Sequence, residues 1–485
     1  MDLIKTGIRG LDNVLRGGLQ ANRSYLVRGG PGSGKTTLGL QFLINSQQQN
    51  SLFISLGESV EKIKADAEKR NFDLQHVHFL ELSPSSDFFR KDEEYNIFSA
   101  QEVEKTPLIN KIVSKIESVQ PDRIFLDSAT YLSYLSNDKF KFRKEILSLI
   151  KFVAEKKAAF LLASESTPDN PDGDLQFVVD GVLNLSSEDN ERYFYVSKLR
   201  GSDYLSGKHS LKLKNDGVHV YPNFIPVKQK VETEKKKLAS GIPSLDKLLN
   251  GGLEKGTITI ISGPTGVGKT TLGIQYLKEA AGRGEKSIIY TFEESPDTII
   301  KRCQAIKIPI KDMLKNSVLE IEEINPLKFT PTEFLNKVKK KVENKGIDVI
   351  LIDSLAGYKM AFPEKSSDND KIRQLHILNK YLSKMGVTVL INNEVTNIIG
   401  DFKATGFGIS YLADNIIILN YYEYESKLKK TIGVLKKRLS GFERYLREFK
   451  IGEYGIEVGK PLTNLQGILT GDIIDLSSGE NSEKR

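Results

Sequence analysis

The chain contains 485 residues, of which 39% are hydrophobic and 27% charged, and its formal net charge at pH 7 is +7. This composition is that of a globular protein, and the length suits two or three domains, which argues against a disordered or fibrous chain. The small positive charge permits anionic partners such as nucleotides but does not indicate a surface built for nucleic acid.

Targeting and membrane signals are missing from the sequence. No apolar run approaches the ~20 residues that a membrane span needs, and the N-terminus lacks the apolar stretch of a signal peptide. Cys303 is the one cysteine, which excludes an internal disulfide framework. We therefore expect a cytoplasmic protein without a membrane partner.

The first half is predicted to alternate strands with helices. The strands are expected at Arg23–Val27, Leu52–Leu56, Arg123–Leu126 and Phe160–Ala163, and the helices at Thr36–Ser46, Val60–Arg70, Ile109–Val119 and Phe142–Ala154. This alternation is typical of a mostly parallel sheet with helices on both faces. From Val178 onward, short strands joined by turns predict an antiparallel appendage at the sheet edge, at Val182–Leu185, Tyr193–Val196 and Leu211–Leu213.

The second half repeats this plan. Its strands are expected at Thr257–Ile261, Ser287–Thr291, Val349–Ile352 and Val387–Ile391, with a helix at Thr271–Ala281 and an antiparallel part that starts at Asn415–Asn420 and Thr431–Val434. A charged, polar run follows Pro222 and Pro226 and is predicted to be a linker. We expect a first domain at 1–227, the linker at 228–239, a second domain at 240–472 and a disordered tail at 473–485.

Two glycine-rich loops, 234 residues apart, each follow a predicted strand and precede a predicted helix. Both fit the pattern G-x-x-x-x-G-K-[ST], whose backbone N–H groups surround the phosphates of a nucleotide while the lysine reaches the β- and γ-oxygens. With the threonine that follows each loop, the predicted ATP-binding residues are Gly29, Gly30, Pro31, Gly32, Ser33, Gly34, Lys35, Thr36 and Thr37, and Gly263, Pro264, Thr265, Gly266, Val267, Gly268, Lys269, Thr270 and Thr271.

Each half also contains an apolar strand that ends in aspartate, at Asp127 and Asp353. An aspartate at the carboxyl end of a central strand lies beside such a loop and can hold the water shell of Mg²⁺. We predict that Thr36 with Asp127, and Thr270 with Asp353, bind Mg²⁺. The alternative is an aspartate that caps the next helix.

Glutamates follow the strand after each loop helix. They are Glu58 in the first half and Glu293 and Glu294 in the second, where Glu294 aligns with Glu58 and Glu293 aligns with Gly57. A glutamate at this place faces the γ-phosphate and can polarise an attacking water or hydroxyl. The alternative is an acid at a helix N-terminus, which the helix dipole favours.

Together, the tandem loops, the paired glutamates and the strand-end aspartates resemble the KaiC-like ATPases, a family of circadian clock proteins and their relatives. The resemblance spans the chain from Leu3 to about Asp475. It implies two RecA-like P-loop domains, a double-ring homo-hexamer with ATP between neighbouring subunits, ATPase activity in the first ring and serine/threonine autokinase activity in the second.

The resemblance also assigns residues near the end of each half. The family's reach-across pair, Lys-x-Arg-Gly, reads Lys198 and Arg200 before Gly201, whereas in the second half Lys436 and Arg438 precede a leucine. Such cations would neutralise charge on the γ-phosphate of the adjacent subunit; the alternative is exposed charge at the end of a strand.

The family's phosphorylated serine corresponds to Ser410, while Tyr411 replaces the adjacent threonine. Gly57 removes one of the paired acids and predicts a slower first ATPase. The short tail argues against a KaiA-type activator, whereas KaiB-like proteins or a histidine kinase with its response regulator are expected as signalling partners.

Two alternatives to an ATPase with autokinase activity stay open. A DNA-dependent RecA-like ATPase would need basic loops facing a channel, which the sequence lacks. A nucleotide-gated signalling scaffold with little turnover would suit intact loops beside one missing acid.

Overall fold

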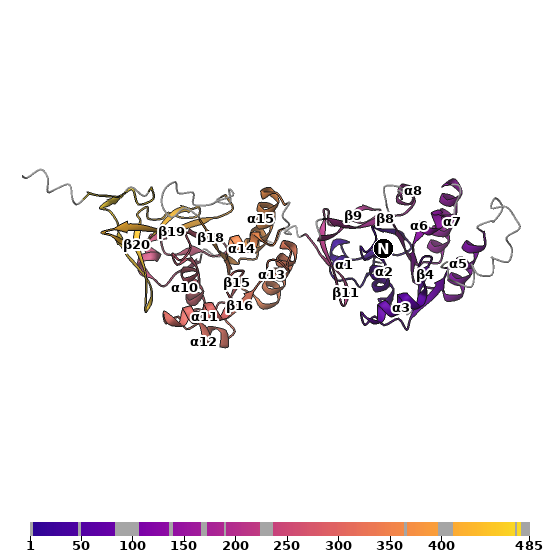
Figure 1. Ribbon diagram of the computed structural model, residues 1–485, viewed down its shortest axis with the longest axis horizontal. Coiled ribbons are helices and arrows are strands. Elements are labelled where there is room, and N and C mark those ends of the chain that lie inside the picture. Colours follow the sequence, from indigo (N-terminus) through magenta and orange to yellow (C-terminus); the bar gives the residue numbers. More distant parts are fainter. Residues whose placement is uncertain are drawn as a thin grey trace, which may run out of the picture. The chain divides into compact units, whose positions relative to one another are not determined.

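The computed structural model describes residues 3–46, 50–82, 106–134, 139–165, 172–188, 191–223, 236–362, 366–395, 411–470 and 473–476. The chain divides into two compact units between Asn223 and Phe224. Figure 1 colours the first from indigo to magenta and the second from pink through orange to yellow. Most of the expected linker and tail lies outside the described residues, so the three predicted domain boundaries stay predictions. Among the helices that are described, none is long and apolar enough to cross a membrane.

A sheet of nine described strands organises the first unit. The parallel strands, in spatial order, are β8 (Gly181–Glu188), β3 (Ser24–Gly29), β7 (Ala159–Ser164), β6 (Arg123–Asp127), β4 (Ser51–Ser55) and β5 (Val77–Glu81). Three antiparallel strands continue the sheet beyond β8, namely β9 (Glu191–Leu199), β10 (His209–Lys214) and β11 (Gly217–Tyr221). A separate two-stranded ribbon joins β1 (Leu3–Ile4) to β2 (Leu19–Gln20).

Alternate residues of each strand enter two different cores, as the two-residue period of a strand requires. On β6, Phe125 packs with Leu38 and Phe42 of α2, whereas Ile124 and Leu126 lie in the core on the opposite face. The helices are α1 (Leu11–Val14), α2 (Lys35–Ile44), α3 (Val60–Glu68), α5 (Thr106–Val119), α6 (Ala129–Tyr134), α7 (Lys139–Glu155) and α8 (Gly173–Val178).

The second unit repeats the strand order of the first. Its parallel strands are β19 (Asn415–Tyr424), β14 (Ile258–Gly263), β18 (Thr388–Glu394), β17 (Val349–Asp353), β15 (Ser287–Thr291) and β16 (Leu319–Glu323), and its antiparallel strands are β20 (Lys427–Lys437), β21 (Arg447–Gly452) and β22 (Gly455–Pro461). Its ribbons pair β12 (Lys237–Leu238) with β13 (Leu253–Glu254), and β23 (Leu465–Gln466) with β24 (Ile474–Asp475).

Helices cover both faces of the second sheet as well, with α10 in one core and α13 and α15 in the other. The helices are α9 (Pro243–Leu248), α10 (Lys269–Gly282), α11 (Pro296–Ala305), α12 (Ile310–Lys315), α13 (Pro331–Lys345), α14 (Leu355–Lys359) and α15 (Asp368–Lys384). The predicted fold class, two tandem α/β domains with mostly parallel sheets and antiparallel edges, is confirmed.

The structure corrects one detail and adds strands that the sequence did not reveal. The strands β8 and β19 pair in parallel with β3 and β14, so each antiparallel part begins one strand later than expected. A strand's own residues do not encode which neighbour it pairs with. The edge strand β16 was not predicted because its residues, Leu-Glu-Ile-Glu-Glu, are largely acidic.

Each loop helix lies unusually close to the strand that ends in aspartate. A Cβ atom added at Gly39 of α2 would lie 2.2 Å from the Phe125 ring, and one added at Gly273 of α10 would lie 2.8 Å from Leu351 of β17. Only glycine permits these approaches without displacing the helix. The two glycines therefore allow the helices to pack closely against β6 and β17, and this packing sets the distance between each loop and its aspartate.

We predict that Gly39→Val pushes α2 away from β6. The added side chain overpacks the core, so the free energy of unfolding should fall by about 1–3 kcal/mol, and nucleotide affinity of the first unit should fall with it. Chemical denaturation and nucleotide titration measure the two effects. Gly173→Ala is the matched control because a Cβ there meets nothing within 4 Å. Unchanged stability of the Gly39 variant would contradict the proposed close packing of α2 against β6.

Candidate functional site

In both units the glycine-rich loop closes around the lysine at the start of its helix. Lys35 Nζ donates hydrogen bonds to the carbonyl oxygens of Gly29 at 2.8 Å and Gly30 at 3.0 Å. Lys269 Nζ donates to the carbonyls of Gly263 and Pro264, both at 2.8 Å. The ammonium group thus lies inside each loop, where the pattern places a phosphate.

The glycine before each lysine has a left-handed backbone, with φ of 104° at Gly34 and 119° at Gly268. A Cβ at Gly34 would also lie 2.9 Å from Leu213 of β10, and one at Gly268 would lie 2.6 Å from Ile451 of β21. Glycine is required here both by conformation and by space. The antiparallel edge strands therefore support the end of each phosphate loop.

A threonine–aspartate pair stands beside each loop. Thr36 Oγ1 donates to Asp127 Oδ2 at 2.7 Å, and Thr270 Oγ1 donates to Asp353 Oδ2 at 2.7 Å. The partners are 91 and 83 residues apart in the sequence. The structure thus brings together, in both units, the lysine, threonine and aspartate that the sequence singled out.

Burial sets the protonation of these groups. It raises the pKa of the Asp127 carboxyl, an effect that the hydrogen bond from Thr36 and the charge of Lys35 oppose. Burial likewise lowers the pKa of Lys35, against the charges of Glu165 and Asp127. Burial also raises the pKa of Asp353. An ionised carboxylate therefore costs folding free energy at each site, a cost that a bound cation would offset.

The two sites differ in what surrounds the aspartate. In the second unit, Asn392 Nδ2 donates to Asp353 Oδ1 at 2.9 Å, and the buried Asn392 Oδ1 atom has no hydrogen-bond partner among the described residues. The register of β7 and β18 places Ala163 at the matching position of the first unit. Asn392 was not predicted. It helps to orient Asp353, whereas in the first unit Asp127 accepts its side-chain hydrogen bond from Thr36.

Carboxylates at the ends of β7 and β18 were also not predicted. Glu165 Oε1 lies 3.8 Å from Lys35 Nζ, and Glu394 acts through its charge on Lys269. In sequence they were visible only as acids that follow strands. Because both strands lie next to the strand that leads into the loop, their ends reach the loop lysine.

The predicted glutamates differ in their partners. Glu58 is exposed and pairs with Lys62 at 2.9 Å. Glu294 pairs with Arg302 at 2.8 Å, and Glu293 accepts a hydrogen bond from Ser354 Oγ, which follows Asp353. In the second unit, Glu293 is thus held at the aspartate end of β17, whereas Glu294 is held by α11.

Gly57 stands where the second unit has Glu293, and a tyrosine fills the space beside it. A Cβ at Gly57 would lie 2.5 Å from the ring of Tyr131 in α6. The residue of the second unit that matches Tyr131 is Gly357, whose added Cβ would lie 2.3 Å from Phe292. The first unit thus has a tyrosine where the second has a glycine, and a glutamate cannot replace Gly57 unless Tyr131 moves.

The lysines of the predicted reach-across pairs bind carbonyls of their own unit. Lys198 Nζ donates to the carbonyls of Gln176 at 2.8 Å and Val179 at 2.6 Å, at the end of α8. Lys436 Nζ donates to the carbonyl of Ala413 at 2.8 Å. Each lysine lies at the same irregularity of strand pairing, between β8 and β9 or between β19 and β20.

The arginines of the same pairs point elsewhere. Arg200 is exposed, and its guanidinium has no hydrogen bond or ion pair within the described part of the chain. Arg438 Nη2 donates to the carbonyl of Tyr411 at 2.7 Å, and its Nη1 lies 3.6 Å from Asp414. Ser410 lies outside the described residues, so its predicted role stays a prediction.

A cavity of about 420 Å³ opens beside the first loop, between α2 and α3. Thr36, Thr37, Glu58 and Asp66 are among its lining residues, and a neighbouring hollow of about 520 Å³ shares Arg70 with it. Pockets of this size hold small ligands. The cavity is next to the loop helix and has room for the part of a nucleotide beyond its phosphates.

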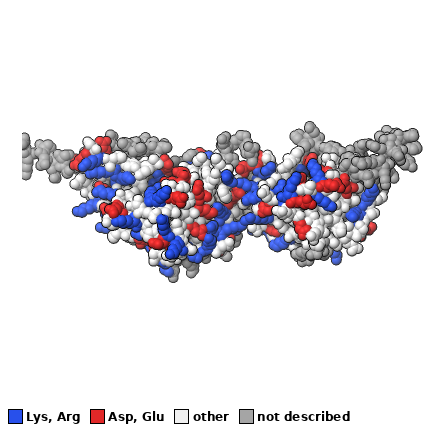
Figure 2. All heavy atoms as spheres, turned by 60° about the horizontal axis from the view of Figure 1, so that its bottom comes forward, with Lys and Arg blue, Asp and Glu red and all other residues white. Residues whose placement is uncertain are grey.

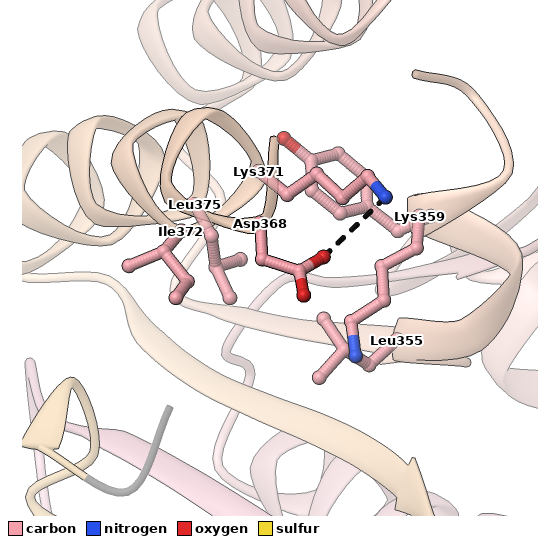
Figure 3. Close-up of a pocket in the computed structure, with 7 residues that line it drawn as sticks. Leu355, Lys359, Asp368, Lys371, Ile372 and Leu375 are labelled. Atoms are coloured by element: carbon pink, nitrogen blue, oxygen red, sulfur yellow. Dashed lines mark ion pairs between the residues drawn. The ribbon is translucent and has the colours of Figure 1, made fainter. Parts of the chain in front are cut away.

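A smaller hollow lies between α14 and α15 of the second unit (Figure 3). Lys371 Nζ lies 3.5 Å from Asp368 Oδ1 there, and burial lowers the pKa of Lys359 to about 8. Its volume of about 10 Å³ is no more than a water molecule needs.

On the face shown in Figure 2, acidic and basic side chains are interspersed in the coloured part of the chain.

The residues at the two aspartates fit a magnesium ion. A threonine hydroxyl and a carboxylate are the hard oxygen ligands that Mg²⁺ prefers, and the ion usually keeps several waters and substrate phosphates as its other ligands. The described residues contain no cluster of three or more His, Cys, Asp or Glu that could hold a metal ion. Thr36 with Asp127, and Thr270 with Asp353, would hold the ion beside the loop.

Comparisons with known proteins agree with this geometry. The sequence model of the family described as the KaiC ATPase matches twice, at residues 4–224 and 238–463. The chain is 27% identical to the Circadian clock oscillator protein KaiC of Picosynechococcus sp., over 99% of this chain and 94% of that protein. It is also 27% identical to the Circadian clock protein KaiC3 of Synechocystis sp., over 97% and 94%, and 25% identical to the oscillator protein of Synechococcus elongatus, over 99% and 93%.

We predict that Asp127→Asn stabilises the nucleotide-free chain but weakens magnesium-dependent nucleotide binding. The raised pKa of Asp127 means that its folding contribution is present at low pH and is lost as the pH rises through that pKa, so the neutral amide should raise the melting temperature at pH 7 to 8. The difference should vanish below pH ~4, where both side chains are neutral. Nucleotide affinity measured with Mg²⁺ should fall about tenfold or more.

The control for this experiment is Asp203→Asn, which changes an exposed aspartate and should alter neither quantity. A lower melting temperature for the Asp127 variant at neutral pH would contradict the argument from burial.

Proposed function

Because the chain belongs to the KaiC family of ATPases, we propose that both loops bind Mg²⁺–ATP and that the protein hydrolyses it between the subunits of a homo-hexamer. The observation that supports this best is the repeated set of lysine, threonine and aspartate, assembled at the same edge of both sheets. A bound Mg²⁺ would neutralise phosphate charge there.

The residues of the chain divide the work as follows. Loop N–H groups and the N-termini of α2 and α10 bind the phosphates, and Lys35 and Lys269 turn from the loop carbonyls toward the phosphate oxygens. Glu58 accepts the proton of the attacking water, and Glu294 that of the attacking water or hydroxyl, because each follows the strand next to the aspartate strand. Glu293 supplies a second carboxylate in the second unit alone.

The proposed hexamer completes each site with cations from the neighbouring subunit. Arg200 is suited to this because it is exposed and its guanidinium is not engaged within the described part of its own chain. Lys198 and Lys436 donate to carbonyls of their own unit, so we assign them a supporting role. We assign the neutralisation of phosphate charge across the interface to Arg200 and Arg438. An arginine that neutralises charge on the transferred phosphoryl group stabilises the transition state.

The second unit is the proposed autokinase. Its two glutamates are held by Ser354 and Arg302, and Asn392 donates to Asp353; we assign this arrangement to the activation of a protein hydroxyl rather than water. Ser410 is the proposed acceptor. Ring assembly and phosphorylation would then be read by signalling partners such as KaiB-like proteins or a histidine kinase with its response regulator.

We predict that Arg200→Ala lowers the ATPase rate of the first site about a thousandfold while leaving ATP binding intact. Steady-state phosphate release in a Glu294→Gln background measures the first site, and native mass spectrometry measures assembly. Arg143→Ala, which removes an exposed arginine of α7, is the control and should keep the full rate. Full turnover of the Arg200 variant would contradict a role across the interface.

We predict that ATP and Mg²⁺ place phosphate on Ser410. Phosphopeptide mapping after incubation should find the modified serine in the wild-type chain and in Lys35→Ala, and should not find it in Lys269→Ala, because the phosphoryl donor is bound by the second loop. ATP consumption with no phosphate on Ser410 or its neighbours would reduce the proposal to an ATPase.

A further inference from the structure

The glutamate of the second site is held by an arginine that has no counterpart in the first. Arg302 of α11 donates from Nη1 to Glu294 Oε1 at 2.8 Å. Arg302 lies eight residues after Glu294, and the residue eight positions after Glu58 is Asp66. Asp66 pairs with Lys69 instead, so the first site has an acid where the second has a base.

The Arg302–Glu294 pair is less exposed to solvent than the Lys62–Glu58 pair of the first site. The side chains of Arg302 and Glu294 are 34% and 38% exposed, whereas those of Lys62 and Glu58 are 65% and 51% exposed. Solvent screens an exposed pair and leaves it worth little, and the screening weakens with burial. The charge of Arg302 therefore acts on Glu294 more strongly than that of Lys62 acts on Glu58.

The contact is poorly satisfied as a structural ion pair. Arg302 Nε and Nη2 and Glu294 Oε2 are buried, and they have no hydrogen-bond partner among the described residues. Buried donors and acceptors without partners cost folding free energy, and a partly satisfied buried pair stabilises little. The pair therefore contributes poorly to stability, which favours a functional reason for its presence.

The pair also faces the proposed magnesium site. The charges of Glu294 and Arg302 both act on Asp353 at the end of β17, with opposite signs. The other group beside them is the buried thiol of Cys303, which is neutral because burial raises its pKa to about 11. The positive charge of Arg302 thus opposes the effect of Glu294 on the pKa of Asp353.

We propose that Arg302 is the positioning residue of the second site: it fixes the Glu294 carboxylate toward the reacting phosphate and makes turnover there depend on α11. The first site lacks this device, and its Glu58 works from an exposed position. This inference rests on the proposed role of Glu294 as the base of the second site. It adds a residue that sets the two sites apart beyond the missing glutamate at Gly57.

The test uses the full chain with the Glu58→Gln substitution, so that the remaining ATP turnover comes from the second site. In this background, Arg302→Met should lower kcat about tenfold or more, because a hydrogen bond between charged groups is lost at the base. KM for ATP should change less than about twofold, since Arg302 contacts the glutamate and not the phosphates. Arg302→Lys should recover part of the rate, because it keeps the charge but not the forked geometry.

Stability separates positioning from a structural role. Arg302→Met should melt at about the same temperature as the parent chain. It removes the buried Nε and Nη2 groups that have no partner among the described residues, and water can reach the Glu294 carboxylate that it leaves unpaired, because that side chain is 38% exposed. The matched control is Lys62→Met in a Glu294→Gln background, which removes the partner of Glu58 and should leave first-site turnover unchanged because that pair is screened.

The outcomes are distinct. A fall in kcat with unchanged KM and unchanged melting temperature supports the proposal, and an unchanged kcat, or a fall in kcat that only follows a lower melting temperature, overturns it. If the Glu58→Gln, Glu294→Gln double variant keeps its turnover, the assignment of the bases is wrong, and the inference about Arg302 falls with it. If Arg302→Met does not fold, Arg302→Gln replaces it with the same expectations.

Discussion

Both sites depend on the close packing of each loop helix against the strand that ends in aspartate. Gly39 against Phe125 and Gly273 against Leu351 leave no room for a side chain, so helix and strand approach to a distance that only glycine permits. That approach brings Thr36 within 2.7 Å of Asp127, and Thr270 within 2.7 Å of Asp353. The threonine–aspartate pair therefore depends on core packing about one turn further along the same face of the helix.

Around this shared frame, the two copies have diverged in polar detail. The second unit adds Asn392, Glu293 and Arg302 to its aspartate end, and each makes a hydrogen bond that the first unit lacks. The first unit instead places Tyr131 over Gly57. Because the strand order and the loop pattern are the same in both units, the proposed difference in chemistry would come from these few side chains. A division of labour between hydrolysis and phosphoryl transfer to protein is consistent with that pattern.

Buried charge links stability to function in both units. Burial raises the pKa values of Asp127 and Asp353, and the Arg302–Glu294 pair keeps buried polar atoms without partners. Each feature costs folding free energy in the chain by itself. The proposed binding of a cation and a nucleotide would offset this cost, since ligands that bind only the folded state stabilise it by mass action. Such sites therefore keep side chains whose replacement would increase stability but not function.

The sequence by itself determined the duplication, the loops and the strand-end aspartates, because these are local patterns: a glycine at a left-handed position, a lysine after it, and an acid at the end of an apolar run. It also placed Glu58, Glu293 and Glu294 correctly after their strands. Only the tertiary structure decided what these residues meet. Glu165, Asn392 and Arg302 reach the sites through strand order and helix packing, and neighbours across a parallel sheet leave no fixed spacing in the chain. The parallel pairing of β8 and β19 was hidden for the same reason.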